Sequence, residues 1–93
     1  MGAQMREPVR LELFRGSKLS EEFIANSEDD LYCRIEMDTG IGWLDAEPLY
    51  QQLIASGRDH ATDTFRVCHS YEKWGDLQQE VVEVKVRMHR IKP

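Results

Sequence analysis

Apolar and polar side chains alternate along several segments of the chain, most regularly near its C-terminal end. Across residues 80–91, the apolar side chains of Val82, Val84, Val86 and Met88 alternate with charged or histidine side chains. This two-residue period is typical of a strand with one buried face. Residues 8–15, 31–37 and 64–69 show the same period, and in the last of these Phe65 and Val67 are expected to point inward. We therefore predict strands over these four ranges.

A short helix is predicted over residues 20–27. Ser20 is a residue that often caps a helix N-terminus, and Glu21 and Glu22 follow it in the turn where the helix dipole favours anions. Gly16 and Ser17 separate this segment from the first strand.

A second helix is predicted between Asp45, expected to cap it, and Gly57, expected to end it. Its buried stripe is expected to comprise Leu49, Leu53 and Ile54, with Tyr50 at the edge and Pro48 tolerated in the first turn. Residues 41–44 fit either a short strand or the lead into this helix. The polar segments 58–63 and 70–79 are expected to be loops.

These elements predict an α+β fold, in which a mostly antiparallel sheet of about four strands has two helices packed on one face. The opposite face is expected to be partly solvated. The polar side chains expected to line it are Arg10, Arg34, Glu36, Lys85 and Arg87.

The length of 93 residues fits a single small domain over residues 1–93, with residues 1–7 loosely ordered. No apolar run is long enough for a transmembrane helix. The net charge of −5 argues against a protein held on nucleic acid by its overall field. The first residues lack a signal-peptide pattern. Cys33 and Cys68 are expected to be buried free thiols, so a cytoplasmic location is predicted.

The string Asp38-Thr39-Gly40 resembles the motif of retroviral-type aspartic proteases, in which each of two copies supplies one aspartate. Those enzymes bury the preceding strand on both faces, whereas Glu36 stands two residues ahead of Asp38 here. The later apolar-apolar-glycine segment of those enzymes is also missing. We interpret the string as a turn. A homodimeric hydrolase acting through Asp38 is kept as an alternative.

Histidine and cysteine side chains do not show the close spacing that forms half of a metal site. The candidates are Cys33, His60, Cys68, His69 and His89. Cys68 and His69 are neighbours on a predicted strand, so they are expected to point to opposite faces. We expect no metal and no cofactor, with a metal-dependent hydrolase using His60 and His69 as an alternative.

Charge is unevenly distributed along the chain. No basic residue occurs from Leu19 to Cys33, a stretch that contains Glu21, Glu22, Glu28, Asp29 and Asp30. A further acidic group surrounds the Asp-Thr-Gly string and comprises Glu36, Asp38, Asp45 and Glu47. The basic side chains at the C-terminal end are Lys85, Arg87, Arg90 and Lys92. Among the aromatic residues, Trp43 is expected in the core and Trp74 on the surface.

These features predict a non-enzymatic protein-binding module, a small acidic adaptor, inhibitor or regulatory protein. Its partner is expected to be a larger protein with a basic surface, such as a nucleic-acid-binding groove. The expected contact residues are Glu28, Asp29, Asp30, Tyr32 and Trp74. Besides the hydrolase, the alternative is a nucleic-acid binder that uses the basic C-terminal strand with Tyr32 stacking nearby. Homodimerisation through an edge strand is compatible with all three functions.

Overall fold

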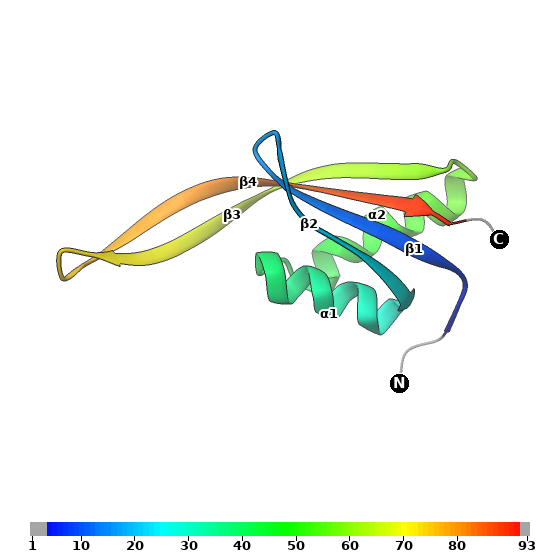
Figure 1. Cartoon of the computed structure of the whole chain (residues 1–93), viewed down its shortest axis with the longest axis horizontal. Helices are drawn as coiled ribbons and strands as arrows, with labels where there is room; N and C mark the ends of the chain where they lie inside the picture. Colours follow the sequence, from blue (N-terminus) through cyan, green and yellow to red (C-terminus); the bar gives the residue numbers. More distant parts are fainter. Residues whose placement is uncertain (1–3, 92–93) are drawn as a thin grey trace.

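The computed structural model of the protein describes residues 4–91 as a four-stranded sheet with two helices on one face (Figure 1). The elements are β1 (Gln4–Arg15), β2 (Lys18–Ser27), α1 (Glu28–Thr39), α2 (Trp43–Ser56), β3 (His60–Lys73) and β4 (Asp76–Arg90). The strands lie in the order β2-β1-β4-β3, and every neighbouring pair is antiparallel. The predicted α+β class is therefore confirmed, whereas the order of helices and strands along the chain differs from the prediction.

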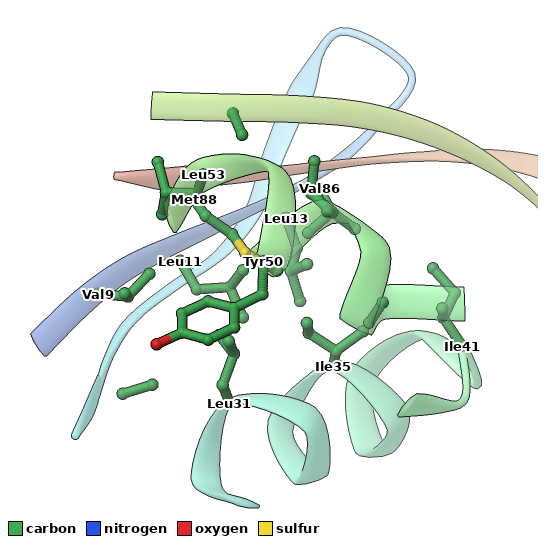
Figure 2. Packing of buried hydrophobic residues seen from close by; sticks show 14 of the residues in the cluster. Val9, Leu11, Leu13, Leu31, Ile35, Ile41, Tyr50, Leu53, Val86 and Met88 are labelled. Atoms are coloured by element: carbon green, nitrogen blue, oxygen red, sulfur yellow. The ribbon is translucent and has the colours of Figure 1, made fainter. Parts of the chain in front are cut away.

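The core lies between the sheet and the two helices. Alternation along β1 and β4 directs one face of each strand toward the helices, as predicted, and that face carries Val9, Leu11, Leu13, Val84, Val86 and Met88. The helices close the core with Leu31 and Ile35 from α1 and with Leu53 from α2 (Figure 2). Leu49 of α2 is buried as well. Tyr50 is also buried in this cluster.

Residues 20–27 form most of β2, so the predicted short helix is wrong. Phe23 lies opposite Leu11 and the buried Ala25 lies opposite Val9, which places both β2 side chains on the core face. This tertiary pairing overrides the local helix-start signal of Ser20 and the two glutamates after it.

Residues 31–37 lie in α1, so the predicted strand is wrong. The Ser27 hydroxyl caps this helix by accepting a hydrogen bond from the Asp30 N–H at 3.1 Å, and Gly40 ends it in a left-handed conformation. Leu31 and Ile35, four residues apart, face the core, because a helix brings such positions to one side. Cys33 is therefore exposed rather than buried.

The second helix was placed correctly at its C-terminal end, where Gly57 adopts a φ of 69°. It begins at Trp43 with Gly42 as its N-cap, so residues 41–44 lead into the helix and Asp45 lies in the first turn instead of capping it. Two expectations of burial are wrong. Ile54 is 50% exposed because it lies about 100° around the helix from Leu53. Trp43 is 51% exposed because it starts the helix beyond the part that packs on the sheet.

The segment predicted as a loop over residues 70–79 is the end of a long hairpin, and the predicted loop over 58–63 already contains the start of β3. Pairing of β3 with β4 continues to Lys73 opposite Asp76, whereas β1 reaches only Val84. Residues 68–81 therefore project beyond the sheet as a two-stranded ribbon, which we call the arm (Figure 1). The arm accounts for the elongated dimensions of 51 × 30 × 19 Å. It exposes Cys68, which was expected to be buried.

The tip of the arm contains a tryptophan in an unfavourable backbone conformation. Trp74 and Gly75 have φ angles of 56° and 81°. Positive φ at both central residues is the signature of a type I′ turn, which normally has asparagine, aspartate or glycine at the first position. Trp74 is also 91% exposed, so its ring gains little from burial in this structure.

We expect Trp74→Asn to stabilise the protein by about 1 kcal/mol, because asparagine tolerates the left-handed region better than other side chains. Thermal unfolding followed by circular dichroism measures the change. Trp74→Ala is the control, because it removes the ring without relieving the backbone. An equal gain from both variants would show that the ring, and not the backbone, is the source of the effect.

Candidate binding groove

A groove of about 670 Å³ lies between α1 and α2. Four carboxylates line it and no basic side chain does, the acids being Glu28, Asp29, Glu36 and Glu47. The remaining lining side chains are uncharged and comprise Tyr32, Cys33, Met37 and Trp43. We call this feature the acidic groove.

The helical period of α1 creates one wall of the acidic groove. Asp29, Cys33 and Glu36 recur at intervals of four and three residues, so they lie on one side of the helix. Glu28 and Asp29 occupy the first turn, where the partial positive charge of the helix N-terminus stabilises carboxylates. The predicted elements left these acids between a helix and a strand, whereas the structure places them at the start of α1.

Asp30, the third acid of this run, faces away from the acidic groove. Its backbone N–H donates to the Ser27 cap, and its carboxylate lies 3.8 Å from Arg34 one turn later. The Arg34 guanidinium in turn lies over the ring of Phe23 on β2, 5.5 Å from its centroid. Arg34 therefore pairs with Asp30 on the side of α1 that faces β2, and no basic side chain lines the groove side.

Tyr32 lies within the acidic groove, where nearby carboxylates create a negative electrostatic potential. Its hydroxyl donates to the Glu28 carboxylate at 3.5 Å, and its ring packs edge-on against Tyr50 at 6.4 Å. Burial raises the pKa of Tyr32 above its ordinary value, and the charges of Glu28 and Glu47 raise it further. A potential that opposes a phenolate favours a cation at the same place.

Exposed apolar side chains stand beside the carboxylates. Trp43 is half exposed, and Met37 is 74% exposed. The sequence analysis did not group these two with the acids. Trp43 begins α2, and it meets α1 only because the two helices pack together after the short link at Gly40. The available signal was the second acidic group around the Asp-Thr-Gly string, of which Glu36 and Glu47 belong to the groove.

The structure does not bring the predicted contact residues together, since Asp30 faces away from the acidic groove and the others lie in two further places. Glu28, Asp29 and Tyr32 share the acidic groove, whereas Trp74 lies at the tip of the arm, well away from α1 (Figure 1). A single small ligand therefore cannot contact all of them.

Asp38 and Thr39 lie in the last turn of α1 and Gly40 caps it, so the Asp-Thr-Gly string is a helix terminus and not the predicted turn after a strand. The Asp38 carbonyl accepts a hydrogen bond from Arg15 at 3.0 Å. The Thr39 hydroxyl accepts one from the Ile41 N–H at 3.1 Å. These bonds fix the link to α2.

The candidate metal ligands are dispersed. Among residues 4–91 no three histidine, cysteine, aspartate or glutamate side chains form a group suited to a metal ion. His60 and His69 are nine residues apart on β3, roughly 30 Å along the strand, and they point to opposite faces. The ring of His60 lies near His89, which is paired with Glu12.

The basic residues of β4 are divided between the two faces of the sheet. Lys85 and Arg87 lie on the open face of the sheet, above the ring of Phe14 at 5.7 and 5.3 Å. Arg90 donates to the carbonyls of Leu53 and Ile54 at the end of α2. Tyr32 is on the helical side, so the sheet separates it from Lys85 and Arg87, and the expected stacking beside these two residues is not found. Lys92 is outside the described residues.

Comparisons of the chain with protein-family models, with curated proteins and with solved structures found no match. Within the described part of the chain, neither helix is long and apolar enough to cross a membrane.

Proposed function

We propose that the protein is a non-enzymatic binding module whose acidic groove holds a basic segment of a partner protein. The observation that carries this proposal is the combination of four carboxylates with exposed aromatic and methionine side chains in one groove that no basic side chain lines. The proposal includes the expected cytoplasmic location, which the two free cysteines support.

The lining of the acidic groove suits arginine or lysine side chains within a peptide. Carboxylates on both helices attract the cationic groups, and the rings of Tyr32 and Trp43 add cation–π contacts. Met37 supplies an adaptable apolar surface for the aliphatic part of a long side chain. The 12 residues of α1 span about 18 Å, which is the length of about five or six residues of extended peptide.

A peptide titration tests this proposal directly, because one of the two tryptophans lies in the acidic groove. In a Trp74→Phe variant, Trp43 is the remaining tryptophan and reports on the groove alone. We expect a peptide of alternating arginine and leucine to change its fluorescence saturably, and a glutamate-leucine peptide of the same length to have no effect. The Trp43→Phe variant, which reports from the arm, should give no signal. An unchanged Trp43 signal would contradict the proposal.

We expect Glu36→Lys/Glu47→Lys to weaken peptide binding by tenfold or more at low salt, with a smaller difference at high salt. The control is Glu21→Lys/Glu22→Lys, which changes the net charge equally but lies on β2, outside the groove. Weakening by both variants to the same degree would mean that overall charge, and not the acidic groove, binds the peptide.

A further inference from the structure

Strand β3 is an unprotected edge of the sheet. It pairs with β4 from His60 to Lys73 without a register shift and contains no proline. Natural edge strands are usually protected by bulges, prolines or similar devices, because their free backbone groups can pair with another strand. The opposite edge, β2, follows this rule, since its pairing with β1 shifts between Leu13 and Phe14.

The direction of the free backbone groups on β3 follows from two hydrogen bonds. The Arg90 N–H donates to the Asp59 carbonyl at 2.8 Å, so odd-numbered positions face β4. Thr64, an even-numbered position, donates its N–H to the Asp63 carboxylate at 2.8 Å instead. The even-numbered residues therefore point to the free edge. The Asp63 carboxylate already accepts the Thr64 N–H, so the outward N–H and C=O groups that can pair with another strand are those of segment 66–72.

The same segment lies largely in the arm, which has no third strand. An isolated two-stranded hairpin is marginally stable in water, and three or more strands are usually needed. The side chains of residues 68–80 are all exposed, so the arm gains little from the core. Additional strands along its edge would supply the missing support.

We propose that two copies of the chain pair antiparallel through residues 66–72 of β3. The two-fold axis is perpendicular to the sheet and passes midway between the two His69 residues. Residues directly opposite in such a pair lie on the same face. Arg66 then lies opposite the partner's Glu72, and symmetry repeats this pair of opposite charges. Val67 lies opposite the partner's Tyr71, and Cys68 opposite the partner's Ser70.

Charge and the free backbone groups disfavour two alternative registers, centred on Arg66 and on Cys68. Centring the axis on Arg66 would place two guanidinium groups opposite each other. Centring it on Cys68 would pair Glu72 with the partner's Thr64, whose N–H already has Asp63 as its acceptor. With the axis at His69, every outward N–H and C=O from residue 66 to residue 72 meets a free group of the partner.

A second copy is also a better occupant of this edge than of the acidic groove. The arm carries Glu72, Asp76 and Glu80 with Lys73 as its basic residue, so four groove carboxylates would repel it. Because the two-fold axis is perpendicular to the sheet, the paired copies form one continuous sheet with all helices on the same side. This proposal does not depend on the function proposed for the groove.

The charge pair provides the first test, read by sedimentation equilibrium from about 1 µM to about 1 mM. We expect the wild type to dimerise, and Arg66→Glu or Glu72→Arg to weaken the dimer by about tenfold or more, because like charges then face each other. The double variant Arg66→Glu/Glu72→Arg should restore it. Thermal melts check that each variant folds, since Arg66 also lies 4.0 Å from Glu83 within the same chain.

Cysteine crosslinking provides the second test, in a Cys33→Ser/Cys68→Ser background. His69→Cys places two thiols at a non-hydrogen-bonded pair with Cα atoms about 4.5 Å apart, within reach of a disulfide. We expect a disulfide dimer after mild oxidation with a copper catalyst. Lys73→Cys is the control, since these positions would be roughly 25 Å apart in the dimer.

A monomer over the whole concentration range would overturn the proposal. A dimer that ignores both charge reversals would overturn it as well, as would equal crosslinking at positions 69 and 73. The Glu36→Lys/Glu47→Lys variant should dimerise normally. The experiments therefore distinguish failure of the groove proposal from failure of the dimer proposal.

Discussion

Replacing Val86 with aspartate is expected to unfold the protein. Val86 lies in the central strand β4 opposite Leu13, and its side chain is completely buried beneath the helices (Figure 2). An aspartate there would bury a charge or a protonated carboxyl without a hydrogen-bond partner. We expect a loss of about 4 kcal/mol or more, which is a large part of the 5–15 kcal/mol typical of a folded domain.

The matched control is Lys85→Asp, one residue earlier on the same strand. Lys85 lies on the open face above Phe14, so its replacement should change stability by about 1 kcal/mol or less. Circular dichroism at 25 °C and thermal melts measure both variants. Equal stability of the two would show that the assigned faces of β4 are wrong.

Shortening Ile35 to alanine is expected to destabilise the protein by about 2–5 kcal/mol, because it leaves a cavity between α1 and the sheet. Ile35 is fully buried in the core (Figure 2). Met37→Ala, two residues later, should have almost no effect, because Met37 is exposed in the acidic groove.

This pair of variants distinguishes a helix from a strand over residues 31–37. A strand would place Ile35 and Met37 on the same face, so both replacements would be costly. A helix places them on different sides. Chemical denaturation measures the two free energies of unfolding, and similar losses would contradict the helical assignment.

The prediction of α1 as a strand shows why local patterns misled. Leu31, Cys33, Ile35 and Met37 fit a two-residue period, but Leu31 and Ile35 alone also fit a helix. The signal that decides between them is the N-cap Ser27, with Asp30 at the third helical position. The prediction placed Ser27 at the end of the preceding helix and did not recognise it as a cap. Ser20 with the two acids after it imitates the same signal, although that segment pairs with β1.

The long β4 strand was predicted over residues 80–91 because the core covers one of its faces from Val82 onward. The arm was not predictable by the same reasoning, because both of its faces meet water and no alternation is required. Its turn has tryptophan where asparagine is usual, so the standard hairpin signal is missing.

Only the part of the candidate site at the start of α1 could be predicted from the sequence. A run of acids without basic residues drew attention to Glu28 and Asp29, both of which line the acidic groove. Glu47 and Trp43 come from α2, and their meeting with α1 depends on how the two helices pack. No local pattern contains that information.

The order of strands in the sheet has a consequence for folding kinetics. Most of the element contacts join neighbours along the chain: β1 with β2, β2 with α1, α1 with α2, α2 with β3, and β3 with β4. In contrast, β1 meets β4 across nearly the whole described chain, with Val9 opposite Arg90. Loop closure over such a separation is slow compared with hairpin or helix formation. We therefore expect two locally formed halves, each a hairpin with one helix, to meet in the rate-limiting step, with the β1–β4 seam as the last part of the sheet to close.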